Sequence, residues 1–287
     1  LLLKTPKERI TLRVEGTGPL GGLVVEADAF GHVRGYVKNP RAEVPLREDG
    51  KLNVGVLVGA GALRVDRSLP SGEVYTSTVP LVSGEIAEDL AHYLWQSEQI
   101  PSAVLLGVRV KGEGEVEVAG GVAVQVMPGA REEVLDRLEA NLKDLPGLTP
   151  LLRERGLEGA LEALLAGLGF ERTDLRALGY FQNEIPARFR CRCNREKALE
   201  ALVFFTPEER EDMIVKDGGA EVVCHWCGEV YRFSPEEVRS LVAEVRCPDC
   251  GTLWLYPKGD GTLARIEGET CRCGRKVELP SETRAQA

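Results

Sequence analysis

The chain has 287 residues, 43% of them hydrophobic, and a formal net charge of -9, a size that suggests about two domains with sizeable cores. The acidic balance argues against a nucleic-acid binder, which relies on clustered Lys and Arg. No stretch approaches the roughly 18 consecutive apolar residues of a membrane span, and the apolar start at residues 1–3 is too short for a signal peptide. We therefore expect a soluble protein that does not bind membranes.

Residues 10–127 alternate between apolar and polar side chains, which is the pattern of strands with one buried face. A helix is predicted at residues 84–99, with Ser83 as its N-cap and an apolar stripe on one side. We expect an α+β fold whose sheet-rich core, residues 1–129, contains this inserted helix. The predicted strands are ITLRV, GLVVEAD, GHVRGYV, ALRVDRSL, EVYTSTV, AVLLGVRV and EVEVAGGVAVQV.

Residues 130–190 change to a helical period and are predicted to form a helical linker. A second helix within it is expected to begin with Thr149 as N-cap and Pro150 at the first helical position. A glycine inside a helix costs about 1 kcal/mol relative to Ala, so glycines here indicate either marginal stability or breaks between short helices. They are Gly156, Gly159, Gly167 and Gly169.

All eight cysteines follow residue 190, in four close pairs. The disulfides of a secreted scaffold are distributed over the chain, whereas clustered pairs in a cytosolic protein more often hold a metal or carry out redox chemistry. We therefore expect a cytoplasmic protein with zinc as its cofactor. The pairs are Cys191-x-Cys193, Cys224-x-x-Cys227, Cys247-x-x-Cys250 and Cys271-x-Cys273.

Short elements are predicted around the first two pairs. Thr206 and Ser234 each begin a capping box with Pro at the first helical position, so a short helix is expected after each. Residues 220–223 and 229–233 have strand patterns, which places the Cys-x-x-Cys pair between them on a β-turn. Zinc knuckles have this arrangement.

Zinc takes four thiolates tetrahedrally at about 2.3 Å, so four cysteine pairs allow two sites. One grouping joins the second pair to the third, a spacing within the zinc-ribbon range, and leaves the two Cys-x-Cys pairs to each other. The other grouping joins the first pair to the second and the third to the fourth. Spacing alone does not decide between them.

The region from Cys191 to Phe233 resembles the redox-switch domain of the bacterial 33 kDa chaperonin family. It has Cys-x-Cys, a helical stretch, and then Cys-x-x-Cys followed by the strand residues YRF. Most of residues 10–240 share this likeness, notably GHVRGYVKNP (31–40), GEIAEDLAHYLWQSEQIPSAVLLGV (84–108) and AGGVAVQVMPGA (119–130).

The resemblance implies a redox-regulated, ATP-independent holdase chaperone rather than an enzyme. In the reduced, inactive form zinc is held by Cys191, Cys193, Cys224 and Cys227. Oxidation forms a disulfide within each pair, releases zinc and allows binding of unfolded client proteins. The family likeness also implies a homodimer in the active form.

The sequence departs from the family pattern at both ends. Family members usually end soon after the second cysteine pair, whereas this chain continues for sixty residues beyond Cys227. We expect residues 191–243 to form the zinc redox-switch domain and residues 244–287 a zinc-ribbon-like extension. A second site is predicted there, on Cys247, Cys250, Cys271 and Cys273. The family's N-terminal segment is absent from the numbered residues, and we expect it to be truncated.

Two rival signals are weak. Gly16-x-Gly18-x-x-Gly21 matches a dinucleotide-binding string, but a predicted strand follows it where that motif requires a helix, so a tight turn explains the glycines. The chain has only three histidines, and the one between the second pair of cysteines, His225, is expected to be a spacer because four thiolates complete a tetrahedron.

Two other function classes remain. A thiol-disulfide oxidoreductase requires its Cys-x-x-Cys at a helix N-terminus, whereas strands are predicted on both sides of the pair here. A constitutive zinc-ribbon adaptor that binds other proteins is the stronger alternative, and it predicts that zinc stays bound under mild peroxide.

Overall fold

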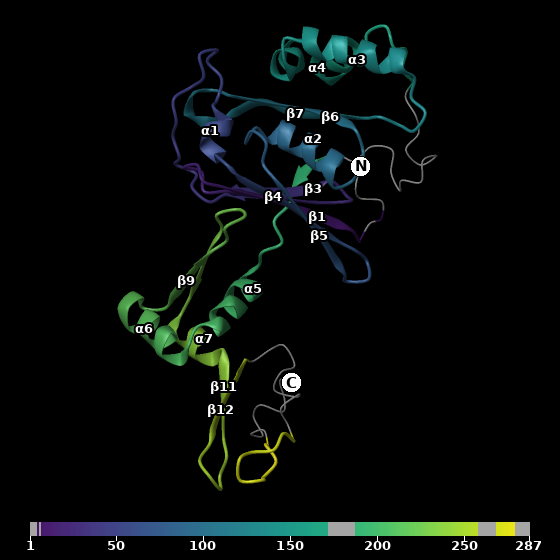
Figure 1. Cartoon of the computed structure of the whole chain (residues 1–287). Coiled ribbons are helices and arrows are strands. Elements are labelled where there is room, and N and C mark those ends of the chain that lie inside the picture. Colours follow the sequence, from purple (N-terminus) through teal and green to yellow (C-terminus); the bar gives the residue numbers. More distant parts are fainter. Residues whose placement is uncertain (1–4, 6, 172–186, 258–267, 279–287) are drawn as a thin grey trace. The chain divides into compact units, whose positions relative to one another are not determined.

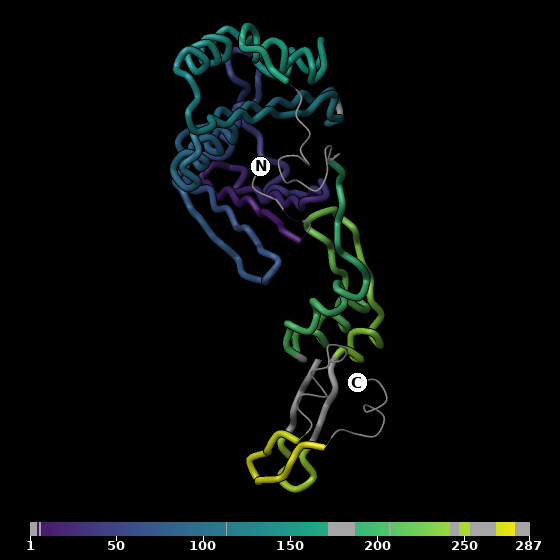
Figure 2. The backbone as a smooth tube through the Cα atoms, turned by 90° about the vertical axis from the view of Figure 1, so that its right-hand side faces the viewer, coloured from purple at the N-terminus to yellow at the C-terminus, as the bar shows by residue number. Residues whose placement is uncertain are grey.

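The computed structural model describes residues 5, 7–171, 187–257 and 268–278. The chain divides into two compact units, Leu1–Arg190 and Cys191–Ala287 (Figures 1 and 2). The first contains most of the strands and the second contains all eight cysteines. The predicted α+β class with a sheet-rich N-terminal core is confirmed.

A six-stranded sheet forms the base of the first unit, in the order β5-β4-β1-β2-β3-β8. Neighbouring strands are antiparallel except β3 and β8, which are parallel. The alternating segments predicted as strands form the sheet because their apolar side chains share its buried face. The bounds are β1 Arg9–Gly16, β2 Leu23–Asp28, β3 His32–Val37, β4 Gly61–Ser68, β5 Val74–Pro80 and β8 Arg188–Phe189.

A long hairpin and two helices complete the core. Helix α2 (Ile86–Gln96) lies between the sheet and the antiparallel hairpin of β6 (Ser102–Val110) and β7 (Val116–Gln125) (Figure 1). The single turn η1 (Gly112–Gly114) joins the two strands, and the short helix α1 (Val54–Val58) precedes β4. The buried core joins the sheet to both helices through Val14, Val58, Leu63, Val65, Val79, Tyr93 and Leu94.

The predicted N-cap of α2 is wrong. The helix begins at Ile86, with Glu85 in the N-cap position, and the hydroxyl of Ser83 accepts a hydrogen bond only from the backbone N–H of Glu85. The fully buried carboxylate of Asp89, one turn into the helix, accepts the backbone N–H groups of Val82 and Ser83 at 2.7 and 3.3 Å. This tertiary contact fixes the chain before the helix and takes the capping role away from the serine.

The predicted linker helices pack on the outer face of the hairpin (Figure 2). Helix α3 spans Glu132–Asp144 and α4 spans Leu148–Leu164. The small core between α4 and the hairpin contains Leu148, Leu151 and Ala160, against Leu105 and Val122 of the hairpin. Residues 172–186 of the predicted linker lie outside the described residues.

The start and the middle of α4 are governed by glycines. Thr149 is not the N-cap, because Gly147 takes a positive φ of 105° and the helix begins at Leu148. At Gly156 the backbone leaves the helical region with φ of 67°, and Gly167 also has a positive φ. Only Gly159 among the predicted four lies within regular helix, so the glycines mainly break the helices.

The glycine-rich string after β1 forms the predicted tight turn into β2. The backbone N–H of Gly18 donates to the carbonyl of Val58 at 2.8 Å, and that of Leu20 donates to Leu57 at 3.0 Å. A side chain at Gly18 would lie 2.3 Å from the carbonyl oxygen of Leu57. The string therefore serves close packing against α1, and its donors are already occupied by protein carbonyls.

The second unit consists of short elements around a small core. Both predicted capping boxes are confirmed, at Thr206 with Glu209 and at Ser234 with Glu237. The core contains Ala198, Leu202, Ile214, Ala220, Phe233, Val238 and Leu241. The elements are α5 Arg195–Glu200, η2 Ala201–Phe204, α6 Pro207–Asp217, β9 Ala220–Val223, β10 Val230–Phe233, α7 Pro235–Ser240, β11 Val242–Arg246 and β12 Leu253–Pro257.

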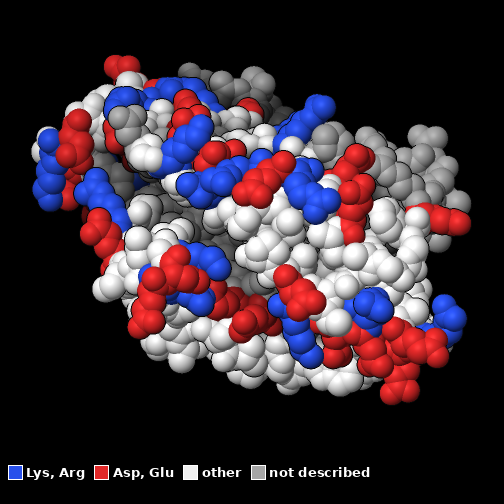
Figure 3. All heavy atoms as spheres, turned by 90° about the horizontal axis from the view of Figure 1, so that it is seen from above, with Lys and Arg blue, Asp and Glu red and all other residues white. Residues whose placement is uncertain are grey.

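Acidic and basic side chains are interspersed on the face of the molecule seen in Figure 3, and the described part of that face carries no broad basic patch. None of the helices among the described residues combines the length and the apolar character needed to cross a membrane.

Asp66 is a buried carboxylate in the sheet that provides a test of the first unit's stability. It accepts hydrogen bonds from Thr76 at 2.7 Å and from Arg64 at 2.8 Å, and it also contacts Arg13. Burial raises the pKa of Asp66, but these partners outweigh burial and hold the pKa below its ordinary value. The charged form therefore stabilises the fold above the unfolded pKa, and this stabilisation is lost as the pH falls through the lowered folded pKa.

We predict that Asp66→Asn lowers the free energy of unfolding of the first unit by about 1.5–3 kcal/mol at pH 7, and that the difference shrinks in strong acid. Urea unfolding at pH 7 and pH 3 measures this. Asp49→Asn, at an exposed loop carboxylate, is the control and should change stability little. Equal effects of the two substitutions at pH 7 would contradict the prediction.

Candidate metal centre

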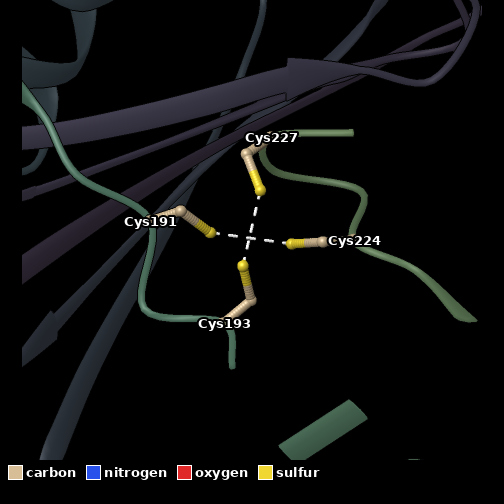
Figure 4. A group of neighbouring side chains, drawn as sticks. All are labelled: Cys191, Cys193, Cys224 and Cys227. Atoms are coloured by element: carbon tan, nitrogen blue, oxygen red, sulfur yellow. Dashed lines mark hydrogen bonds between the residues drawn. The ribbon is translucent and has the colours of Figure 1, made fainter. Parts of the chain in front are cut away.

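Four cysteines meet at the start of the second unit. The sulfur atoms of Cys191, Cys193, Cys224 and Cys227 all lie within 4.8 Å of one another. Sulfur–sulfur distances are 3.6 Å between Cys191 and Cys224 and 3.4 Å between Cys193 and Cys227. All four are free thiols, and Figure 4 shows the four sulfurs pointing toward a common centre from two separate segments.

The second pair lies on a tight turn between β9 and β10. The backbone N–H of Cys224 donates to the carbonyl of Glu229 at 2.9 Å, and that of Gly228 donates back to Cys224 at 2.8 Å. Gly228 has a positive φ of 74°, which favours glycine. The turn holds the thiols of Cys224 and Cys227 toward the same point, as the knuckle pattern predicted.

The first pair is held differently, by the start of α5. Asn194 follows Cys193 directly and caps this helix by accepting the backbone N–H of Lys197 at 2.8 Å. At the next position, the guanidinium of Arg195 lies 4.5 Å from the centre of the Phe233 ring and bonds Glu237 at 2.6 Å. The beginning of α5, and with it the first pair, is thereby tied to β10 and α7.

Crowding of the thiols decides their protonation. Burial raises the pKa of Cys191, but hydrogen bonds from the backbone and side chain of Cys193 and from the other thiols outweigh it and leave the pKa at about 6. A backbone hydrogen bond from Glu229 lowers the pKa of Cys227, but burial and the three neighbouring thiols raise it to about 12. Negative charge on one thiol opposes charge on its neighbours, so a bound cation would favour the fully deprotonated cluster.

Tyr231 of β10 adds a hydrogen-bond donor to the cluster. Its hydroxyl donates to the sulfur of Cys193 at 3.2 Å, and this contact with the thiol raises the pKa of Tyr231. Cys193 itself is half-buried, whereas Cys227 is exposed. The cluster is therefore accessible to small reagents at Cys227 and has a polar partner at Cys193.

The donor set fits zinc. Tetrahedral zinc with four thiolates at about 2.3 Å places neighbouring sulfurs about 3.8 Å apart, close to the 3.4 and 3.6 Å separations of this cluster. His225 is not among the atoms that gather at the centre. The predicted metal role of these four cysteines is thus compatible with the geometry and stays a prediction.

A second group forms from the third and fourth cysteine pairs. The sulfurs of Cys247, Cys250, Cys271 and Cys273 also lie within 4.8 Å of one another. Cys247 approaches Cys273 at 3.6 Å, and Cys250 approaches Cys271 at 3.3 Å. The structure thus joins the first pair to the second and the third to the fourth. The zinc-ribbon grouping of the second pair with the third does not occur.

Two residues of the first centre were missed from the sequence. Asn194 had a usable signal, because Asn is a preferred N-cap and three helix-forming residues follow it. Tyr231 had none, because its contact with Cys193 joins residues 38 positions apart and depends on how β10 packs against the first pair.

The chain matches the family described as Hsp33 protein over residues 1–234. A protein named 33 kDa chaperonin from Thermus thermophilus is 99% identical over 287 residues, which are 100% of this chain and 84% of that protein. One of the same name from Deinococcus radiodurans is 50% identical over 244 residues, covering 84% of this chain and 80% of that protein.

A solved structure supports the same assignment. The crystal structure of the 33 kDa chaperonin, a heat shock protein 33 homologue, from Thermotoga maritima has a TM-score of 0.72 with this chain at 44% sequence identity. The match covers 84% of this chain and 78% of that one. The family predicted from the sequence is confirmed, and the chain belongs to the Hsp33 family of 33 kDa chaperonins.

Proposed function

We propose that this chain is a redox-regulated, ATP-independent chaperone that binds unfolding proteins after its first cysteine centre is oxidised. Family membership supports a chaperone that binds unfolded clients. The observation that carries the regulatory part is the gathering of four free thiols, two from each of two segments, around one point. A cytoplasmic location, a non-enzymatic role and a homodimer in the active form belong to the same proposal.

In the reduced state the four thiolates of Cys191, Cys193, Cys224 and Cys227 would hold zinc. Bound zinc keeps all four sulfurs deprotonated and contributes on the order of 10–16 kcal/mol of apparent binding energy to folding. The four cysteines bring the segment before α5 to the turn between β9 and β10. Cys191 and Cys224, whose sulfurs are in contact, are 33 residues apart in the sequence. The inactive form is therefore the ordered one.

Oxidation by a peroxide acts on each cysteine pair. One thiolate attacks the peroxide, so that the O–O bond breaks and a sulfenic acid and hydroxide form. The thiolate of the paired cysteine then attacks the sulfenic sulfur, an S–S bond forms, and the oxygen leaves as hydroxide. Per pair, two thiolates lose two electrons, and one peroxide takes up these electrons and two protons to give two waters. Once both pairs are disulfides, Cys191, Cys193, Cys224 and Cys227 would offer no thiolate ligands to zinc.

Disulfides within each pair matter because they separate the two segments. A bond across the pairs would still cross-link the segment before α5 to the β9–β10 turn, whereas bonds within each pair leave no cross-link between them. What remains is the core of the second unit, with seven buried residues. Loss of the metal contribution from so small a core would expose apolar side chains such as Leu202, Phe233 and Val238 to clients.

The domain organisation is part of the proposal. We assign the chaperone core to residues 1–129, the linker to residues 130–190, the switch to residues 191–243 and the extension to residues 244–287. Support for a linker that responds to the switch comes from the small cluster of three buried residues between α4 and the hairpin, and from the break in α4 at Gly156.

The alternative classes fit the site less well. Cys224 and Cys227 lie in a turn between two strands rather than at a helix N-terminus, so the helix dipole that activates a thiol-disulfide oxidoreductase is missing from this pair. A constitutive adaptor would keep its zinc under peroxide and bind partners equally in both redox states.

We predict that the zinc-loaded, reduced protein suppresses aggregation of a thermally unfolding client weakly, and that peroxide with mild heat releases zinc and increases suppression at least several-fold. Dithiothreitol with added zinc should reverse both changes. Zinc release is followed with a chromogenic chelator and client aggregation by light scattering. Suppression of client aggregation that is the same before and after oxidation would contradict the proposed switch.

We further predict that Tyr231→Phe speeds peroxide-driven zinc release several-fold. The tyrosine hydroxyl donates to the sulfur of Cys193, and a hydrogen bond to a thiolate reduces its electron density and nucleophilicity. Tyr75→Phe, at an exposed strand residue of the first unit, is the matched control and should release zinc at the wild-type rate. Equal rates of zinc release for the two variants would contradict a role of Tyr231 in slowing oxidation.

A further inference from the structure

We propose that Cys247, Cys250, Cys271 and Cys273 form a second zinc centre that is structural and keeps its zinc when the first centre is oxidised. The family match ends at residue 234, so this group lies outside the region that defines the family. The inference concerning retention rests on the proposed switch, whereas the existence of the second centre does not.

The donor set supports a metal site in its own right. The nearest sulfurs are 3.6 and 3.3 Å apart, close to the roughly 3.8 Å expected for four thiolates around zinc. Of residues 268–278, only Cys271 and Val277 are buried, so this segment has little apolar contact to hold its shape. Metal ligation supplies the missing folding energy in small sites of this kind.

Both halves of the second group are closed turns. The backbone N–H of Cys247 donates to Thr252 at 2.9 Å, and that of Gly251 donates to Cys247 at 2.9 Å. In the other half, Cys271 donates to Arg275 at 2.8 Å and Gly274 donates to Cys271 at 2.8 Å. An ion pair between Asp249 and Arg275 at 2.9 Å connects the two halves.

The first centre has a closed turn in one half only. Its Cys224 half has the same two backbone bonds, but its Cys191 half continues directly into the capped start of α5. A disulfide within a pair must bring the two sulfurs to about 2.05 Å. The Cys191 pair, which no closed turn holds, has the most freedom for this change, and the second centre has no pair of this kind.

Burial also distinguishes the two centres: the second combines two buried with two exposed cysteines, whereas the first has three half-buried cysteines and one exposed. Each pair of the second centre contains one buried cysteine, Cys247 at 8% and Cys271 at 5% exposure, whereas the first centre has none. Oxidation of a thiol follows its exposure. An exposed partner that becomes a sulfenic acid must then be attacked by a buried, metal-bound sulfur, which slows disulfide formation.

The test measures the number of zinc ions per chain by elemental mass spectrometry, before and after peroxide treatment. It compares the wild-type chain with two double variants. Wild type should fall from two zinc ions to one. Cys191→Ser with Cys193→Ser opens the first centre, and this variant should hold one zinc and keep it. Cys271→Ser with Cys273→Ser opens the second, and this variant should hold one zinc and lose it.

Each failure has a distinct meaning. A first-centre variant without zinc would overturn the second centre, and one that loses its zinc as fast as wild type would overturn its structural role. If the second-centre variant keeps its zinc, the proposed switch fails while the second centre stands.

Hydrogen exchange in the wild-type chain provides a test that does not depend on whether the cysteine variants fold. Residues 268–278 should stay protected after peroxide, and loss of protection there at the same rate as in residues 191–194 would overturn the proposal.

Discussion

Mutual repulsion among closely packed thiolates is the constraint on which the second unit depends. Four sulfurs within 4.8 Å cannot all carry charge without a cation, and the raised pKa of Cys227 expresses this cost. A cation bound by all four sulfurs would cross-link the segment before α5 to the β9–β10 turn. Apart from this cross-link, the two segments are held together by a small core of short helices and strands. On the proposed function, one chemical event at these four sulfurs would control the order of residues 191–241.

The surrounding structure makes this control sharp. The capping boxes at Thr206 and Ser234 and the contacts of Arg195 stabilise short helices that have few buried residues of their own. On the proposed function, such elements would be ordered by the cross-link and would have little stability in reserve without it. The first unit is built differently, with a continuous sheet and a core joined to α2, so it can remain folded while the second changes.

The sequence correctly predicted those features whose interactions lie within a few residues of one another. Alternation gave the strands, and both capping boxes formed because all of their partners lie within one turn. The N-caps at Ser83 and Thr149 failed where other parts of the fold intervene, through Asp89 and Gly147. The grouping of the cysteines was open on spacing, because it depends on how distant segments pack, and it was the family likeness that favoured the grouping found in the structure.

The central claim is that metal ligation by the first centre, and not the apolar core alone, holds residues 191–241 together. It is tested most directly by hydrogen exchange of the reduced protein before and after a strong zinc chelator, with no oxidant present. The account predicts a large rise in amide exchange across residues 191–241, with the strands of the first unit unchanged. Unchanged protection of residues 191–241 in the metal-free, reduced protein would contradict it.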